Sequence, residues 1–370
     1  MGMRVPYSYL ERQFVHNVDA ILADIRELVR TGDYTLGAAV TDFEGRYARQ
    51  LGVRHAIGVN SGTEALTLAL EAVGVRPGDE VVTAPNTFIA TVGAIVAAGA
   101  RPVFVDVNAE HNIDPTLIEA ALTPRTRALL PVHLSGNPAD MPAVLEIARR
   151  WGLPVVEDAC QAFGASIDGR SVGTWGDAAG FSLHPLKPLN VWGDGGIIAS
   201  DSDAMADHLR LRRNHGLRNR DTVEIFGVNS RLDTLQAIVG RHLLDGIMAI
   251  TDRRIANARR LDRGLAALGG DITIPPRRPG ARHVYQTYVV QARDRDALVR
   301  FLNERGVEAK IHYPVPVHLQ PAAKELGHKP GDFPVCETQA REIVTLPSHQ
   351  FLTDEEIDYV IQQVREFYQR

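Results

Sequence analysis

Lysine is scarce in this chain of 370 residues, which contains four lysines among its 40 lysines and arginines. Arginine holds a positive surface charge at least as well as lysine, but it does not lose its proton near neutral pH and cannot act as a nucleophilic amine. Lys187 is the only lysine in the first 309 residues. A leftover surface lysine is one explanation, so its surroundings, FSLHPLKPLNVWGDGG (181–196), must decide its role.

Other absences exclude whole classes of protein. The two cysteines, Cys160 and Cys336, are too few for a disulfide framework and suit a reducing compartment. Residues 1–15 contain no apolar run typical of a signal peptide, and the most apolar stretch, residues 91–107, is interrupted before it reaches the roughly 20 residues of a membrane span. A net charge of −5 offers no general surface for nucleic acid. We therefore expect a cytoplasmic protein without a membrane or nucleic-acid partner.

Short apolar runs alternate with segments of helical periodicity through about the first 245 residues. This alternation predicts an α/β fold with a mostly parallel sheet between helices. The expected strands are residues 56–59, 80–84, 102–107, 128–134, 154–159, 179–183 and 196–200.

The alternation weakens after residue 245, where a long charged helix (250–270), a proline-rich loop, a strand (283–292) and a helix (295–306) are expected. We predict a large α/β domain over residues 1–245, including an N-terminal segment 1–15, and a smaller C-terminal α+β domain over residues 246–370.

Ser61, Gly62 and Thr63 lie between an expected strand and an expected helix. Glycine lets backbone N–H groups approach a ligand, hydroxyls add donors, and a helix N-terminus favours an anion, so the triplet suits a phosphate. A simple helix cap is the alternative. The sequence has neither GxxxxGK[ST] nor GxGxxG, which disfavours nucleotide cofactors, and we expect no metal site.

Three further segments carry groups that suit one cofactor. Asp158 follows an apolar strand, where a carboxylate would stabilise a protonated ring nitrogen or, alternatively, cap a helix, and Gln161 is near it. Lys187 precedes Pro188 in a rigid apolar loop, where loss of hydration would lower its pKa and free its amine for a Schiff base. Ser182 adds a hydroxyl, and Phe88 offers a flat face or packs in the core. Together these groups suit pyridoxal 5′-phosphate (PLP).

The ordered motifs resemble those of the DegT family of PLP-dependent sugar aminotransferases over nearly the whole chain, which implies the fold-type-I architecture of aspartate aminotransferase. Among the matching stretches are GDYTLGAAVTDFE (32–44), VNSGTEAL (59–66), PGDEVVTAPNTFIAT (77–91), VVEDACQAFGA (155–165), the Lys187 loop, GVNSRLDTLQA (227–237) and HYPVPVHLQP (312–321).

The resemblance implies a role for each matching residue. Lys187 would bond to the cofactor and shuttle protons, Asp158 would pair with the pyridine nitrogen, Gln161 would bond the ring hydroxyl, and Phe88 would stack on the ring. Ser61, Gly62, Thr63 and Ser182 would hold the phosphate, and Asn229 would reach the phosphate of the neighbouring subunit in a homodimer with shared active sites. Tyr34, His184, Tyr313 and His318 would line the sugar side.

The implied reaction moves an amino group from L-glutamate to a keto-sugar, commonly nucleotide-linked. The sequence GDGG (193–196) favours relatives that aminate C-3 over those acting at C-4, which often have GEGG. Leu183 stands where relatives usually have phenylalanine, His184 where they have an aromatic residue or histidine, and Pro188 where they have asparagine; of these, His184 is the position expected to tune substrate choice. A PLP-binding regulator without turnover, a PLP-dependent sugar dehydratase and an NAD-dependent oxidoreductase are the alternatives. The presence of Lys187 disfavours the dehydratase, and the missing GxGxxG disfavours the oxidoreductase.

Overall fold

The computed structural model describes residues 4–369 of the chain. Its α-helices are α1 (Leu10–Gln13), α2 (Val18–Thr31), α3 (Ala38–Leu51), α4 (Gly62–Ala72), α5 (Ile89–Ala97), α6 (Pro115–Ala121), α7 (Met141–Trp151), α8 (Asp203–Arg212), α9 (Thr234–Leu244), α10 (Ile247–Leu265), α11 (Arg295–Glu304), α12 (Pro334–Glu342) and α13 (Asp354–Tyr368). Its strands are β1 (His55–Val59), β2 (Glu80–Thr83), β3 (Arg101–Phe104), β4 (Thr126–Leu129), β5 (Val156–Asp158), β6 (Ser166–Ile167), β7 (Arg170–Ser171), β8 (Ala178–Ser182), β9 (Gly196–Ser200), β10 (Ile272–Thr273), β11 (Ala281–Arg282), β12 (Tyr288–Ala292) and β13 (Ile343–Leu346).

The centre of the fold is a sheet in two hydrogen-bonded parts, ordered β1-β9-β8-β5 and β3-β2-β4. Parallel bridges from Leu129 to Val155 and from Val132 to Asp158 join the two parts. Strands β2, β3 and β4 run parallel, as do β5 and β8, whereas β9 is antiparallel to both β1 and β8. The predicted α/β class with a mostly parallel sheet is confirmed, with β9 as the exception.

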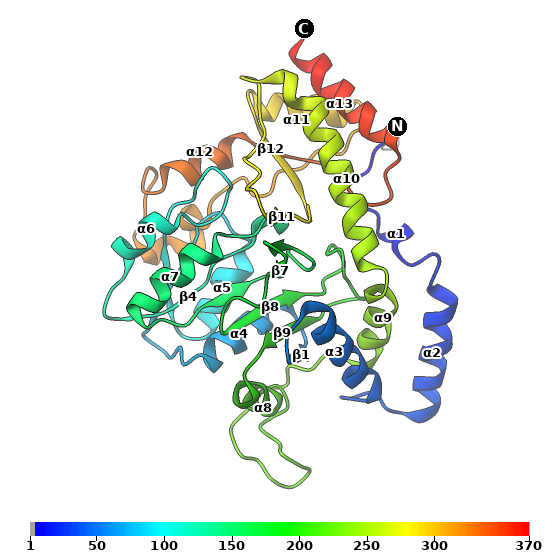
Figure 1. The fold of residues 1–370 in the computed structure, drawn as a ribbon, viewed down its shortest axis with the longest axis vertical. Helices are drawn as coiled ribbons and strands as arrows, with labels where there is room; N and C mark the ends of the chain where they lie inside the picture. Colours follow the sequence, from blue (N-terminus) through cyan, green and yellow to red (C-terminus); the bar gives the residue numbers. More distant parts are fainter. Residues whose placement is uncertain (1–3, 370) are drawn as a thin grey trace.

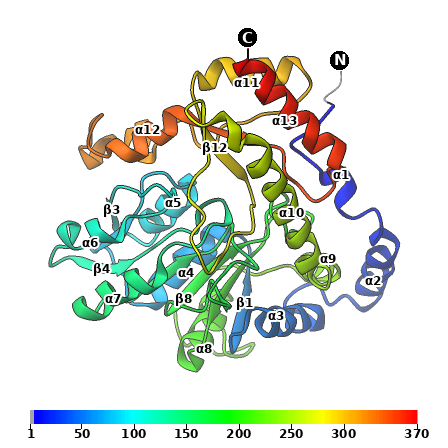
Figure 2. The ribbon, with the colours of Figure 1, turned by 45° about the horizontal axis from the view of Figure 1, so that its top comes forward.

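Helices cover both faces of this sheet, because successive side chains of a strand point to opposite faces. In β9, Ile197 packs in one apolar core with Phe43 of α3 and Val239 of α9. The next residue, Ile198, packs in another core with Leu68 of α4. Both views of the ribbon show the sheet between these helices (Figures 1 and 2).

A separate apolar core lies in the second part of the chain. It joins α10, α11 and α13 with β12 and β13, and it also contains Val5 from the N-terminal segment. The domain boundary at residue 245 stays a prediction, although α9 ends at Leu244 and α10 begins at Ile247. Helix α10 therefore leads directly from the sheet region into the second core (Figure 1).

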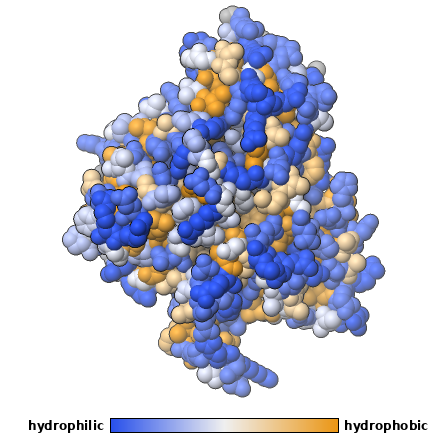
Figure 3. All heavy atoms as spheres, in the orientation of Figure 1, coloured by the Kyte–Doolittle hydropathy of each residue, from blue (hydrophilic) through white to orange (hydrophobic). Residues whose placement is uncertain are grey.

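The face seen in Figure 3 is mostly hydrophilic, with apolar residues scattered between polar ones. Across residues 4–369, no helix combines the length and the apolar character needed to span a membrane.

The cores predict where substitutions destabilise the chain. Leu70 of α4 is fully buried, so Leu70→Ala should lower the free energy of unfolding by about 2–5 kcal/mol through lost apolar contact and a residual cavity. Leu22 of α2 is 48% exposed, and Leu22→Ala should change it by no more than about 0.5 kcal/mol. Urea unfolding followed by circular dichroism measures both. Equal losses in the two variants would contradict this assignment of the core.

Candidate active site

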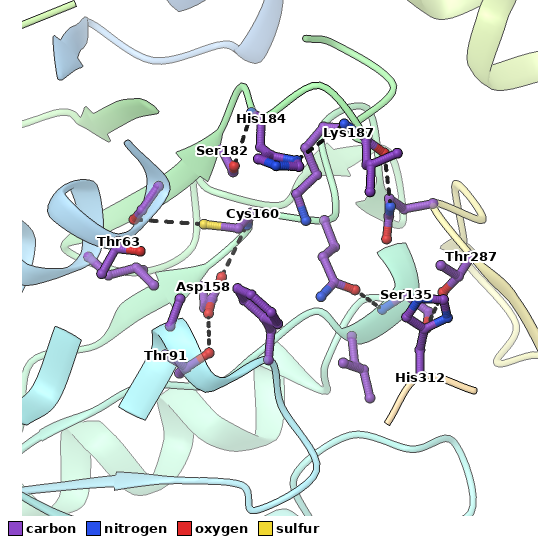
Figure 4. A pocket seen from close by; sticks show the side chains of 18 of the residues that line it. Thr63, Thr91, Ser135, Asp158, Cys160, Ser182, His184, Lys187, Thr287 and His312 are labelled. Carbon is purple, nitrogen blue, oxygen red and sulfur yellow. Dashed lines mark hydrogen bonds between the residues drawn. The ribbon is translucent and has the colours of Figure 1, made fainter. Parts of the chain in front are cut away.

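A cavity of about 390 Å³ opens at the edge of the sheet where β5 and β8 end. Figure 4 shows its labelled side chains pointing inward from several different elements. The cavity is lined by Tyr7, Ser61, Gly62, Thr63, Leu66, Phe88, Ala90, Thr91, Leu134, Ser135, Asp158, Cys160, Gln161, Ser182, His184, Leu186, Lys187, Asp194, Gln286, Thr287, His312 and Tyr313.

Lys187 is the only lysine or arginine in this lining. It follows β8 in a loop whose turn is closed by a 2.8 Å hydrogen bond from its backbone N–H to the carbonyl of His184. Its side chain extends toward the middle of the pocket (Figure 4). Burial lowers the pKa of Lys187, and the neighbouring Cys160 and Asp158 act in the opposite direction without cancelling the effect. The amine is therefore easier to deprotonate than an ordinary lysine.

Asp158 ends β5 and is 5% exposed. Its Oδ2 accepts a 2.7 Å hydrogen bond from the hydroxyl of Thr91, and its Oδ1 accepts one of 3.1 Å from the backbone N–H of Cys160. The hydroxyls of Thr91 and Thr87 lie 2.6 Å apart. Because Thr91 gives its hydrogen to the carboxylate, Thr87 must donate to Thr91. Donors of this kind stabilise the charged carboxylate and fix its orientation.

The start of α4 forms an anion cradle beside these two groups. Ser61 caps the helix, with its hydroxyl accepting a 3.2 Å hydrogen bond from the backbone N–H of Glu64. A Cβ on Gly62 would lie 2.7 Å from the Cβ of Ser182 and 3.1 Å from the Sγ of Cys160, so only glycine fits there. The helix N-terminus and the hydroxyls of Ser61, Thr63 and Ser182 suit a phosphate.

Aromatic and amide groups border the space between Lys187 and Asp158. Phe88 is 48% exposed, and its ring lies 5.7 Å from that of Tyr313. The exposure shows that Phe88 is not simply a core residue. Burial raises the pKa of Tyr313 to about 12, so its hydroxyl stays protonated. Gln161 accepts a 2.7 Å hydrogen bond from the backbone N–H of Ser135, which leaves its NH₂ group as a donor.

Several lining residues were not singled out from the sequence. Thr91 lies inside a quoted motif, and Cys160 lies between Asp158 and Gln161, so position in the motif could have suggested both. His312 begins the quoted motif that contains Tyr313, so its position could also have suggested it, whereas Tyr7 and Thr287 come from distant segments and carried no such signal. Tyr7 and His312 stack with ring centroids 5.5 Å apart.

Three predicted residues lie outside the cavity of this chain. His318 is buried 3.2 Å from Glu337, against the ring of Phe333, and is not among the residues that line this cavity, so its predicted sugar contact stays a prediction. Tyr34 is 53% exposed, and Asn229 forms a backbone bridge with Asn214. Neither Tyr34 nor Asn229 lines the cavity. Their predicted contacts stay predictions.

A half-buried reactive lysine, a facing carboxylate and an anion cradle at the carboxyl edge of an α/β sheet define a PLP-dependent enzyme of fold type I. The comparisons with known proteins agree with this class. The model of the DegT/DnrJ/EryC1/StrS aminotransferase family matches residues 16–365. The chain belongs to this family and is a sugar aminotransferase.

Relatives share the full length of the chain. The dTDP-3-amino-3,4,6-trideoxy-alpha-D-glucose transaminase of Streptomyces venezuelae is 42% identical, with 99% of this chain and 97% of the relative covered. The "Pleiotropic regulatory protein" of Geobacillus stearothermophilus is 40% identical, with 99% of both covered. The crystal structure of DesV from S. venezuelae in complex with a ketimine intermediate superposes with a TM-score of 0.97 at 41% identity, covering all of both chains.

The cofactor of the enzyme is PLP, and NtdA from Bacillus subtilis, a solved neighbour with a TM-score of 0.93 at 32% identity, holds its amine form PMP. That alignment covers 100% of this chain and 86% of NtdA. The residues of this chain fit such a group. Gly62 lets the start of α4 approach Ser182 and Cys160 closely, and the amine, the carboxylate and the hydroxyls line the same cavity.

The lowered pKa of Lys187 predicts when its amine reacts. In the cofactor-free folded protein, labelling of Lys187 by a small acylating reagent should reach half its maximum at a lower pH than in urea-denatured protein, where the ordinary value of about 10.4 applies. Mass spectrometry of the peptide containing residue 187 measures the labelled fraction. An equal midpoint in the two states would show that burial does not shift this amine.

Proposed function

We propose that the enzyme transfers the amino group of L-glutamate to C-3 of a nucleotide-linked keto-sugar. The observation that carries the proposal is the half-buried amine of Lys187, whose pKa is lowered, in the cavity that also contains Asp158 and the α4 cradle. The preference for C-3 draws on GDGG (193–196) and on relatives whose names describe 3-amino products or 3-keto substrates.

Each part of the cavity has a task in this reaction. Ser61, Gly62, Thr63 and Ser182 would hold the phosphate of PLP, and Asp158 would accept a hydrogen bond from its ring nitrogen. When bound, PLP supplies an aldehyde that bonds to amines and a ring that accepts an electron pair. Phe88 would cover one face of the ring, and the NH₂ of Gln161 would donate to the ring oxygen.

Lys187 would act as the general base and acid. Burial lowers the pKa of its Nζ, so the free amine is more readily available than in an ordinary lysine. Lys187 would take the proton from the donor carbon that bears the amino group and would hold it on Nζ for the following transfer. Repeating these transfers in reverse order delivers the amine to the keto-sugar, so the two substrates use the same base in turn.

Asp158 would keep the ring nitrogen of PLP protonated through both half-reactions. The hydroxyl chain from Thr87 through Thr91 holds the carboxylate at one orientation and stabilises its charged form. Because Asp158 is 5% exposed, water does not compete for the remaining lone pairs.

The sugar would enter past the open side of the cavity. Asp194 is exposed there and His184 lies close to Lys187. Burial, together with the neighbouring Lys187, lowers the pKa of His184, while Asp194 acts to raise it. A neutral imidazole and a carboxylate both hydrogen-bond sugar hydroxyls, and this pair would therefore contribute to the choice of sugar.

A second copy of the chain would complete the site. The phosphate of PLP and a nucleotide sugar bring several negative charges to a cavity whose own lining has one lysine and no arginine. The loop between α8 and α9 extends from the body of the molecule (Figure 1) and exposes 97% of Phe226. Such an exposed aromatic suits burial against another chain, which would place Asn229 near the phosphate of the partner.

The half-reactions separate the donor from the acceptor. Glutamate added to the PLP-loaded enzyme should abolish the visible band of Lys187-bonded cofactor and release 2-oxoglutarate. Lys187→Arg cannot form this band, and it should slow the release of 2-oxoglutarate by roughly 10³-fold or more because arginine cannot act as the base. Lys310→Arg, whose side chain pairs with Glu308 at 2.7 Å, is the matched control and should react normally.

Keto-sugars offered to the amine-loaded enzyme then report the acceptor. A nucleotide-linked 3-keto-sugar should restore the band, and a response to 4-keto-sugars alone would contradict the assignment of C-3. If glutamate reacts but no keto-sugar does, the proposed acceptor class is wrong. Absence of a pyridoxyl group on residue 187 after borohydride reduction would reject the role of Lys187.

Mixed dimers test the shared site. Lys187→Ala and Asn229→Ala should each be strongly impaired alone. After the two are dissociated and reassociated in equal amounts, about half of the dimers would be hybrids with one intact site, which gives about a quarter of wild-type activity. Activity that stays at the level of the two separate variants would contradict a site shared through Asn229.

A further inference from the structure

The two backbone carbonyls that flank Lys187 are both held by glutamine side chains. Gln286 donates from Nε2 to the carbonyl of Leu186 at 3.2 Å, and Gln13 donates from Nε2 to the carbonyl of Pro188 at 3.2 Å. Gln13 ends α1, whereas Gln286 precedes β12. Two segments more than 270 residues apart in sequence therefore hydrogen-bond to the lysine loop, one before and one after Lys187.

Both glutamines are linked to one arginine of α10, Arg254. Its Nη2 donates to the backbone carbonyl of Gln286 at 2.7 Å, and its Nη1 donates to Oε1 of Gln350 at 2.7 Å. Nε2 of Gln350 donates in turn to Oε1 of Gln13 at 2.7 Å. One arm thus runs from Arg254 through Gln286 to residue 186, and the other runs through Gln350 and Gln13 to residue 188.

The donor at one end of the longer arm, Arg254, and the acceptor at the other, the carbonyl of Pro188, fix the direction of the hydrogen bonds between them. A guanidinium only donates and a backbone carbonyl only accepts, so both glutamine amides between them must point their oxygens toward Arg254 and their nitrogens toward Pro188. If either amide were flipped, two donors or two acceptors would face each other without a hydrogen bond. Hydrogen bonds aligned in this way polarise one another, which stiffens the chain as a unit.

The surroundings of Arg254 show that it serves this network rather than an ion pair. It is 3% exposed, and within residues 4–369 its hydrogen bonds go to the carbonyls of Tyr285 and Gln286 and to the amide of Gln350. No carboxylate of the described residues forms an ion pair with it. Removing a charge from water without a counter-ion is costly, so all of its contacts are expected to contribute to holding the structure.

We propose that Arg254 is a positioning residue for Lys187, which it places through the Gln286 arm and the Gln350–Gln13 arm. The inference rests on the proposed role of Lys187 as the amine that bonds to PLP. Holding the carbonyls before and after residue 187 fixes the backbone from which the side chain reaches the cavity. A small displacement of a reacting group far from the chemistry is enough to slow a reaction substantially.

The test follows bond formation rather than turnover. PLP is added to cofactor-free enzyme, and the rate at which the visible band of Lys187-bonded cofactor appears is measured at several pH values. Each of three single variants should lower the rate at which the band appears by about tenfold: Gln13→Leu, Gln350→Leu and Gln286→Leu. The pH at which the rate is half-maximal should rise, because a looser loop admits water and returns the pKa of Lys187 toward its ordinary value.

Double variants test the two arms. Gln13→Leu and Gln350→Leu lie on the same arm, so the double variant should be no slower than either single one. Gln13→Leu and Gln286→Leu lie on different arms, and their effects should multiply to about 100-fold. Arg254→Met should match that double variant if its circular dichroism and melting curve show a folded chain; the glutamine variants decide the question if it is not folded.

Gln339→Leu is the matched control. Gln339 is also a buried glutamine that donates to a backbone carbonyl, that of Asn108 at 2.8 Å, but it has no link to the lysine loop. It should keep the wild-type rate and pH profile. Arm variants that behave like Gln339→Leu, or same-arm effects that multiply, would overturn the proposal. A wild-type enzyme without a pyridoxyl group on residue 187 after borohydride would instead reject the role of Lys187.

Discussion

The site depends on keeping one amine out of water beside a carboxylate. Lys187 loses hydration in its loop, and this loss lowers its pKa more than Cys160 and Asp158 raise it. Access of water would return the pKa of this amine toward its ordinary value, so less of it would carry a free nucleophilic electron pair. Three features of the structure keep Lys187 in this environment. The sheet edge lies beneath the cavity, prolines stand on both sides of the lysine, and buried glutamine amides bind the carbonyls next to it.

The sheet brings the chemical groups together because several connections leave it at one edge. Ser61 follows β1, Asp158 ends β5, and Ser182 ends β8. Strand β9 runs antiparallel between β1 and β8, so it begins at this same edge with Gly196. A Cβ there would lie 2.2 Å from the carbonyl oxygen of Ser61, so glycine lets the start of β9 approach the cradle. The GDGG sequence therefore has a packing role beside the lysine loop, in addition to any role in substrate choice.

Local sequence predicted much of this and missed what depends on distant contacts. The apolar runs marked the strands, and Ser61, Asp158, Ser182 and Lys187 lie in short motifs next to them, so their meeting at the sheet edge followed from the strand pattern. The direction of β9 did not follow, because a short, mostly apolar run such as GIIAS looks alike in either direction. His318 lies in a motif that contributes Tyr313 to the cavity, but Glu337 and Phe333 enclose it elsewhere. Nothing near Tyr7 or Gln13 in sequence shows that each would reach a loop near residue 187.

These long-range contacts make the site depend on more than one part of the fold. The sheet edge alone can place Asp158 and the anion cradle, since β1, β5, β8 and α4 belong to the large apolar cores. The lysine loop also needs Gln13 from the N-terminal segment and Gln286 beside the second core, and Arg254 of α10 connects them. Because the arms join three parts of the chain, docking of the second core against the sheet is coupled to the geometry of the single residue that bonds the cofactor.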